Sequence, residues 1–464
     1  MIEKVYTFLW GDLIRIPLPG GSTLGISLLI LLLIPTGIYF TIRTKLLPIR
    51  LFPDMVRALS EKKSDKNNLS AFQTLIVSTA TRVGMGNLVG VVAAISAGGA
   101  GAVFWMWIIG ADRFLHCILI EASPGTAAIK KRILYMVATG AVPAYYIHRY
   151  WEEKQGRKRK KVLLSVLFAI SGLICWCGIS QVISNSVTSA FHNAFHIPPI
   201  YTTVVLVALA AVIIFRKTAT VKVLDVLVPI MAGCYFLITV ILICMNFSAL
   251  PGVFSRIFEE AFGIRQAVAG GLGTVVMNGV KRGLFSNEAG SGSAPCAAAA
   301  AESDQPVKLG LTQALGVFID TIVICSCTAM IMLLTPESLT EGAVGMELLQ
   351  VAMGYHLGQF GVIFIAATLW LFSFSTFLGI LYYARSNISY LFGDGMLPQN
   401  LYKVLALVMM FIGGLAAYTV VWDLGDVGVG LMTVFNIIML YPMSGIAMKA
   451  LKSYETEKKN RKKG

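Results

Sequence analysis

The chain has 464 residues, of which 56% are hydrophobic and 13% are charged, and its net charge at pH 7 is +14. Soluble domains carry about 25% charged residues, so this composition excludes an ordinary soluble protein and indicates a membrane protein with many spans. The first 23 residues contain no basic segment followed by an apolar one, so no cleaved secretory signal is expected.

Eleven apolar segments are long enough to cross a bilayer, which takes about 20 helical residues. The predicted spans are 24–43, 72–97, 101–122, 162–190, 199–215, 223–246, 265–280, 309–334, 358–384, 404–421 and 428–448. Residues 51–67 mix charged and apolar side chains, which predicts a helix at the membrane interface. We expect one all-α transmembrane domain over residues 1–448, followed by a basic cytoplasmic tail at 449–464.

Charged residues alternate between the two sets of loops that these spans define. One set carries 32 of the 38 lysines and arginines, and its loops are 43–66, 123–161, 216–222, 281–308, 385–403 and 449–464. The opposite set is poor in cations and holds acidic residues such as Glu337, Asp423 and Asp426. The positive-inside rule predicts an N-terminus outside and a C-terminus in the cytoplasm. Topogenic charge and anionic lipid account for the basic tail without any nucleic acid.

The second span is interrupted by glycines and polar residues in Thr79-Ala80-Thr81-Arg82-Val83-Gly84-Met85-Gly86-Asn87-Leu88. A break in a membrane helix is tolerated only where it lines a cavity or is buried in protein. The freed amides can hold a carboxylate, and the freed carbonyls can hold Na⁺. A broken helix is therefore predicted here, and close helix packing through Gly86 and Gly90 is the alternative.

The seventh span is also unusual, because it contains Gly270-Gly271-Leu272-Gly273 and leads into the glycine-rich polar stretch Gly279–Pro295. It lies five spans after the second span, as expected for two repeats of five helices that follow one extra helix. Glycine-interrupted spans at corresponding positions of two repeats indicate the binding site of a transporter. We predict a hinge and inner gate at Gly279–Pro295 and a substrate pocket nearer Gly84–Asn87 and Gly270–Gly273. A packing seam is the alternative for the Gly270–Gly273 run.

Several single polar residues lie within predicted spans. The hydroxyls of Ser373-Phe374-Ser375-Thr376 either bond to their own helix or act as ligands of a small cation. Gln181 and Asn185 share one helix face and bind either a substrate or another helix. Asp320 is an intramembrane carboxylate, which indicates function, and Arg82 is one candidate partner. The sequence shows no catalytic acid–base pair and no ATP motif, so we expect a carrier driven by an ion gradient and not an enzyme.

At these motifs the chain resembles the alanine/glycine:cation symporter family, the sodium–alanine symporters. The resemblance rests on the segments Arg82–Asn87, Gly98–Trp107, Gly283–Pro295, Gly316–Thr321 and Asp423–Met432. It implies eleven spans with an inverted-repeat core of the LeuT type. It also implies Na⁺-coupled uptake of alanine or glycine across the cell membrane by alternating access, with no cofactor besides the coupling ion. The alternatives are a proton-coupled carrier in which Asp320 titrates and a passive channel.

The resemblance also implies roles for individual residues. The substrate-binding residues it implies are Gly84, Gly86, Asn87, Gln181, Asn185, Gly271 and Gly273. The sodium-binding residues are Val83, Ser375 and Thr376. The gate and hinge residues are Gly283, Asn287, Glu288 and Gly290.

Two features depart from the family pattern. Met85 stands where the family usually has threonine, so it adds bulk and removes a hydroxyl. Residues 112–142 do not follow the pattern, which resumes at Pro143. Codons permitted for Arg132–Val142 can be read in another frame as a loop of the family type. A compensated frameshift is therefore predicted for this aberrant segment.

Overall fold

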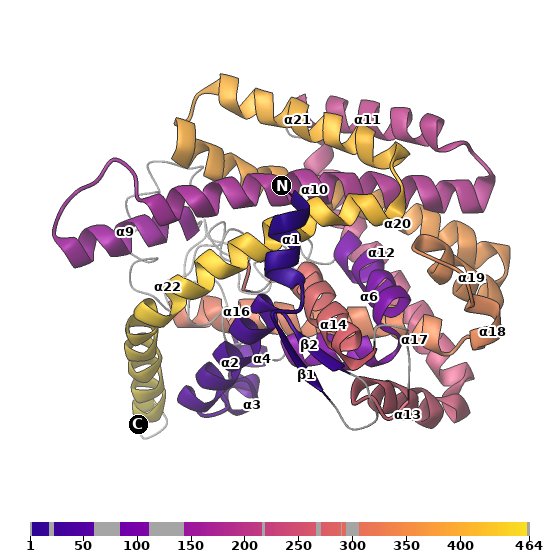
Figure 1. The fold of residues 1–464 in the computed structure, drawn as a ribbon, viewed down its shortest axis with the longest axis horizontal. Coiled ribbons are helices and arrows are strands. Elements are labelled where there is room, and N and C mark those ends of the chain that lie inside the picture. The colour runs from indigo at the N-terminus through magenta and orange to yellow at the C-terminus, as the bar shows by residue number, and fades with distance from the viewer. Residues whose placement is uncertain are drawn as a thin grey trace.

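The computed structural model describes residues 2–17, 23–59, 84–110, 143–215, 219–265, 271–288, 290–293 and 306–461. Within these residues the fold is helical apart from one antiparallel hairpin (Figure 1). The hairpin pairs β1 (Ile14–Pro17) with β2 (Thr23–Ile26), and Ile14 lies opposite Ile26. The predicted helical class is therefore confirmed. The aberrant segment 112–142 lies outside the described residues.

The described helices range from short turns to long rods of more than thirty residues. In chain order they are α1 (Ile2–Trp10), α2 (Leu28–Arg43), α3 (Leu47–Arg50), α4 (Phe52–Leu59), η1 (Gly86–Gly90), α6 (Val91–Gly98), α9 (Pro143–Gln155), α10 (Leu163–Phe195), α11 (Pro199–Phe215), α12 (Ala219–Met245), η2 (Phe247–Ala249), α13 (Leu250–Ala261), α14 (Gly271–Asn287), α16 (Pro306–Phe318), η3 (Ile319–Cys325), α17 (Ser326–Leu333), α18 (Glu337–Thr340), α19 (Met346–Leu357), α20 (Gln359–Phe392), α21 (Met396–Leu415) and α22 (Tyr418–Arg461). Residues 101–110 form a further apolar helix.

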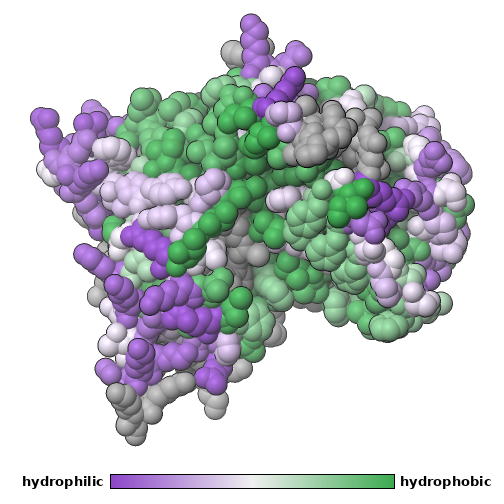
Figure 2. Space-filling view, turned by 60° about the horizontal axis from the view of Figure 1, so that its bottom comes forward, coloured by the Kyte–Doolittle hydropathy of each residue, from purple (hydrophilic) through white to green (hydrophobic). Residues whose placement is uncertain are grey.

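Five helices in the described ranges are long and apolar enough to cross a membrane: α10, the α16–α17 run, α20, α21 and α22. A sixth results if the two segments that meet at 76° between α12 and α13 count as one span. The apolar helices α2, 86–98, 101–110 and α11 are shorter. Figure 2 shows apolar residues across the middle of one face, with polar residues toward its left and right sides. The count of eleven spans remains a prediction.

Helix α10 is the central packing element, because it contacts α20, α21 and α22 (Figure 1). Small residues let these backbones approach closely. A Cβ atom added to Gly428 of α22 would lie 2.3 Å from the Cα of Cys175 on α10. Close approach of this kind increases van der Waals contact, which drives helix association inside lipid.

The second and seventh predicted spans pack against each other in opposite directions. A Cβ on Gly86 would lie 3.1 Å from the Cα of Ser286, near the end of α14. At the opposite end of the contact, a Cβ on Gly98 would lie 3.0 Å from the Cβ of Asn278. The run of η1 and α6 is therefore antiparallel to α14. Inverted repeats require this relation between corresponding helices, while the complete repeat remains a prediction.

Helix α22 extends further than predicted at both ends. The chain turns at residues 416–417, so Asp423 and Asp426 lie within α22 and not in the loop predicted between the last two spans. Residues 449–461, predicted as a tail, continue the same helix. There Lys458 forms an ion pair with Asp54 of α4, and Arg50 of α3 lies 2.7 Å from Glu455. The position of Asp423 and Asp426 within α22 corrects the predicted boundaries of the loop between the last two spans.

Two glycines of α22 provide a test of this packing. We expect Gly428→Ala to lower the free energy of unfolding by about 1–3 kcal/mol, because the methyl group would overlap the α10 backbone. Gly445→Ala is the matched control, because a Cβ at Gly445 would meet no atom within 4 Å. Thermal unfolding in detergent, followed by tryptophan fluorescence, measures both. Equal midpoints in the two variants would contradict the α10–α22 contact.

Candidate functional site

Three irregular helical segments meet near the centre of the fold: η1, the C-terminal end of α14, and η3. Both η1 and η3 are π-helical, a form that is frequent at functional sites. They bring together Asn87, Ser286, Asp320 and Cys325, which we call the Asn87–Asp320 cluster. Each of these side chains is at most 3% exposed.

Hydrogen bonds connect the members of the Asn87–Asp320 cluster. The Asn87 side-chain amide donates to Asp320 Oδ1 at 2.7 Å and to the Asp320 carbonyl at 3.2 Å. Ser286 Oγ and Thr321 Oγ1 donate to Asp320 Oδ2 at 3.3 and 3.2 Å. The Asn87 side-chain oxygen accepts from the Gly84 amide at 3.0 Å. An ionised carboxylate is costly to bury without such donors. Carboxylate, amide and hydroxyl oxygens are also the hard ligands that a small cation prefers.

Helix α14, in the seventh predicted span, ends directly after this cluster. Helix α14 ends at Asn287, and the next residues adopt left-handed backbone conformations, with φ of 51° at Glu288, 93° at Gly290 and 97° at Gly292. The Gly290 carbonyl accepts from the side-chain amide of Asn436 at 2.9 Å. The break in the seventh span therefore lies beside the start of η1.

The residues predicted to form one pocket lie at two ends of α14. Gly271 and Gly273 lie at the opposite end of α14, about 20 Å along the helix from Ser286. There a Cβ on Gly273 would be 2.7 Å from the Gly25 amide of β2, so this glycine serves contact with the hairpin. The residues beside Asn87 belong instead to the stretch predicted as a gate. Gly283 packs against Met106 of the 101–110 helix.

Gln181 and Asn185 contact another helix, which is one of their two predicted roles. Gln181 Nε2 lies 3.4 Å from the sulfur of Met409 on α21. Asn185 donates to the carbonyls of Gly413 and Ala416 at 3.1 and 2.8 Å. Both side chains therefore hold α10 against α21.

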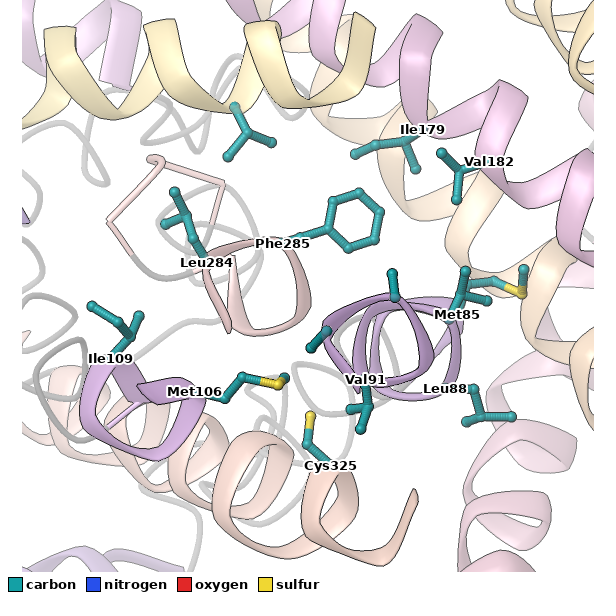
Figure 3. Packing of buried hydrophobic residues seen from close by; sticks show 14 of the residues in the cluster. Met85, Leu88, Val91, Met106, Ile109, Ile179, Val182, Leu284, Phe285 and Cys325 are labelled. Atoms are coloured by element: carbon teal, nitrogen blue, oxygen red, sulfur yellow. The ribbon is translucent and has the colours of Figure 1, made fainter. Parts of the chain in front are cut away.

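The face of α10 that points toward the cluster is apolar. In Figure 3, Ile179 and Val182 lie opposite Phe285 and Met85. All four side chains are at most 8% exposed. Sequence analysis missed Ile179 and Val182, because aliphatic residues in a span carry no signal that separates a site wall from ordinary packing.

The predicted sodium ligands are brought to the start of η1 only in part. Thr376 Oγ1 accepts a hydrogen bond from the Met85 amide at 3.2 Å. Ser375 Oγ donates to the Phe372 carbonyl of its own helix at 3.0 Å, as the alternative interpretation predicted. A hydroxyl that donates in this way keeps lone pairs that can bind a cation. Val83 and Arg82 lie outside the described residues.

A second polar cluster lies one helical turn from Ser286. The positive-inside rule predicts its two cations and its carboxylate on opposite sides of the membrane, whereas the structure brings them together. Arg282 of α14 makes a two-pronged pair with Asp426 of α22, with N–O distances of 3.0 and 3.1 Å. Lys281 Nζ lies 2.7 Å from the same carboxylate. We call Lys281, Arg282 and Asp426 the ion cluster, and each is at most 5% exposed. Lys281 and Arg282 are therefore buried helical residues and not part of a cytoplasmic loop, because Asp426 neutralises them inside the protein.

Aromatic side chains separate the ion cluster from the Asn87–Asp320 cluster. The Arg282 guanidinium stacks over Trp422 at 3.7 Å from the ring centroid. Trp422 in turn meets Phe285 edge-on at 4.9 Å. Phe285 also packs on η1, because a Cβ on Gly90 would lie 3.5 Å from its Cδ1, so the two rings connect α22 to the helix that carries Asn87.

Comparison with known proteins identifies related chains. A family model described as the sodium:alanine symporter family matches residues 20–464. The amino-acid carrier protein AlsT of Bacillus subtilis is 37% identical over 438 residues, which cover 92% of this chain and 89% of AlsT. GlnT of the same species, named a probable sodium/glutamine symporter, is 38% identical over 440 residues, covering 93% of this chain and 89% of GlnT. The sodium/alanine symporter AgcS of Methanococcus maripaludis is 31% identical over 477 residues, covering 100% and 98%.

A solved structure shows a similar fold. A mutant of the manganese transporter from Eremococcus coleocola matches with a TM-score of 0.50 and 12% identity. The match covers 83% of this chain and 80% of that one. At this identity the likeness concerns the fold alone.

The ion cluster predicts unequal effects for two aspartates on α22. We expect Asp426→Asn to lower the free energy of unfolding by about 3–5 kcal/mol, because two buried cations would lose their carboxylate. Asp423→Asn, at an exposed position one turn away, should change it by less than about 0.5 kcal/mol. Denaturant unfolding in detergent measures both. A similar loss in both variants would show that Asp426 has no special role.

Proposed function

The chain belongs to the sodium:alanine symporter family, and we propose that it couples Na⁺ entry to the uptake of alanine or glycine by alternating access. The family and the relatives are transporters, which confirms the expectation that the chain is not an enzyme. It is a multi-pass membrane protein with several spanning helices. The observation that carries the proposal is that the start of η1 and the end of the antiparallel helix α14 meet beside a buried carboxylate.

The two helix ends at this point suit a zwitterionic amino acid. The run of η1 and α6 begins beside Gly84 and Met85, so its N-terminal amides and positive dipole end favour the substrate carboxylate. Helix α14 ends at Asn287, so its negative dipole end favours the substrate ammonium group or a cation. Gly84, Gly86 and Asn87 are the substrate-binding residues that we retain.

The wall opposite these helix ends favours a small apolar side chain. Ile179, Val182, Phe285 and Met85 present only hydrocarbon, aromatic and thioether groups (Figure 3). A hydrophobic wall cannot satisfy the amide of a glutamine side chain. We therefore propose alanine or glycine as the substrate and not the amino acid in the name of GlnT.

Two groups of oxygens are proposed to bind Na⁺. One is the predicted set of Val83, Ser375 and Thr376, in which Thr376 contacts the Met85 amide. The other is the Asn87–Asp320 cluster, where Asp320 supplies a fixed negative charge next to the hydroxyl of Ser286. In the alternative of a proton-coupled carrier, the proton binds at the same carboxylate of Asp320 instead of Na⁺.

The N-terminus is proposed to lie outside and the C-terminus in the cytoplasm. Lys458 near the end of α22 pairs with Asp54 of α4, in the basic part of the chain that the positive-inside rule assigns to the cytoplasm. Asp426 lies 32 residues earlier in α22, which corresponds to about 48 Å of helix. The ion cluster and α1 then lie toward the outer side.

Transport by proteoliposomes tests the coupling ion. We expect uphill accumulation of labelled alanine under an inward Na⁺ gradient and none under a proton gradient alone. Asp320→Asn should reduce Na⁺-driven uptake at least about tenfold, since the fixed charge near the proposed site is lost. Protein-free liposomes provide the background. Accumulation driven by protons without Na⁺ would favour the alternative, and uptake that never exceeds equilibrium would indicate a channel.

Substrate selectivity tests the apolar wall. Met85→Ala should raise glutamine uptake relative to alanine uptake by about tenfold or more, because the longer side chain gains room. Met106→Ala is the matched control: both methionines are at most 2% exposed, but Met106 packs on Gly283, away from α10 (Figure 3). Competition assays with labelled alanine measure the ratio. An equal shift in both variants would place the side-chain wall elsewhere.

A further inference from the structure

The N-terminal segment of residues 2–26 contacts both helices that the ion cluster joins. It consists of α1 and of the described parts of the β1–β2 hairpin. Helix α1 packs on α22, and strand β2 packs on α14. The segment therefore crosses from one helix to the other beside the Arg282–Asp426 pair.

Helix α1 is anchored on α22 by its last turn. Leu9 and Trp10 are both 1% exposed. A Cβ on Gly430 would lie 3.0 Å from Leu9 Cδ1 and 3.3 Å from Trp10 Nε1, so the glycine admits these side chains. Trp10 Nε1 also donates to the backbone carbonyl of Asp426 at 3.0 Å. This hydrogen bond connects α1 to the residue that holds the ion cluster.

The same helix holds Lys281 of α14. Lys281 Nζ donates to the Tyr6 hydroxyl at 2.6 Å. It also lies 4.6 Å from the centroid of the Tyr6 ring and 5.6 Å from that of Trp10. Tyr6, Trp10 and Asp426 thus surround one ammonium group that belongs to the opposite helix.

The hairpin makes the second attachment to α14. The backbones of Gly25 and Gly273 approach so closely that a side chain on Gly273 would overlap the Gly25 amide at 2.7 Å. Because β2 continues after one residue into α2, this attachment is held by the rest of the chain. Helix α14 is therefore fixed to the N-terminal segment at its first turn and again at Lys281.

We propose that the described parts of the N-terminal segment, residues 2–17 and 23–26, act as a strap that must release Lys281 before α14 and α22 separate to open the Asn87–Asp320 cluster to the outside. The Phe285–Trp422 contact and the Arg282–Asp426 pair lie on the α22 side of α14, the helix that carries Ser286. Both join the two helices that the strap also joins. Separation of the helices breaks the Lys281 contacts, so the strap sets how often the outer side opens.

A native thiol inside the cluster reports this opening. Cys325 Sγ lies 3.1 Å from Ser286 Oγ, and the residue is 3% exposed. A membrane-impermeant methanethiosulfonate added outside right-side-out vesicles reaches Cys325 only when the outer side is open. Peptide mass spectrometry measures the modification rate at this position in the full-length chain. The readout needs neither alanine nor a Na⁺ gradient, so its result is distinguishable from a failure of the proposed function.

Three substitutions loosen the strap at different atoms. Tyr6→Phe removes the hydroxyl, Trp10→Phe removes the indole N–H, and Lys281→Met removes the charge with little change in size. Tyr6→Phe removes a hydrogen bond to a charged group that exists only in the closed state. Such a loss shifts the equilibrium toward the open state about tenfold or more, so the modification of Cys325 should be faster by at least that factor. Phe8→Ala is the matched control, because Phe8 is on α1 but 61% exposed.

The outcomes separate the strap from a merely structural segment. Faster modification in Tyr6→Phe and Trp10→Phe, with the wild-type rate in Phe8→Ala, supports the proposal. If Tyr6→Phe and Trp10→Phe are both modified at the wild-type rate, the proposal is overturned. An equally large increase in Phe8→Ala also overturns it. Thermal unfolding identifies variants that fold. If Lys281→Met does not fold, the two aromatic variants decide the question.

Discussion

The carboxylate of Asp426 pairs with two buried cations of the neighbouring helix, and this pairing determines how α1, α14 and α22 are assembled. Unpaired charges cannot remain in an apolar interior, so Lys281 and Arg282 require α14 to lie against α22. Trp10 binds the backbone of Asp426, and Tyr6 binds Lys281, so α1 takes its position from the same charges. The contact between Phe285 and Trp422 then follows from the helix pairing.

The interrupted helices obey a second rule, that backbone and side-chain polar groups in a membrane must find partners within the protein. Asn87 supplies partners on both sides, because its oxygen accepts from the Gly84 amide and its nitrogen donates to Asp320. Asn436 does the same for the carbonyl of Gly290. Two amide side chains, those of Asn87 and Asn436, thus supply partners for backbone groups where the helices begin and end.

Apolar length and glycine content predicted much of this fold from sequence. The span at 199–215 coincides with α11, and the interruption near Asn87 was expected from its glycines. Charge was a poorer guide, because the positive-inside rule treats charged residues as solvated. It could not reveal that Arg282 pairs with Asp426, 144 residues away. Residue spacing alone does not assign the faces of α10: successive residues differ by about 100° around a helix, so Val182 points toward Met85 while Gln181 contacts Met409 of α21.

Helix α22 connects the two ends of the molecule without interruption. Near its start it touches α1 through Asp426, and near its end it touches α4 through Lys458. Pro442 lies between these contacts, and Figure 1 shows the last part of the helix turning away from the first. A proline lacks the amide hydrogen that would stiffen the helix at this point. The two ends are therefore connected through the bend near Pro442. A tilt of α22 that weakens its contact with α1 also changes the geometry of the ion pairs that the other end makes with α3 and α4.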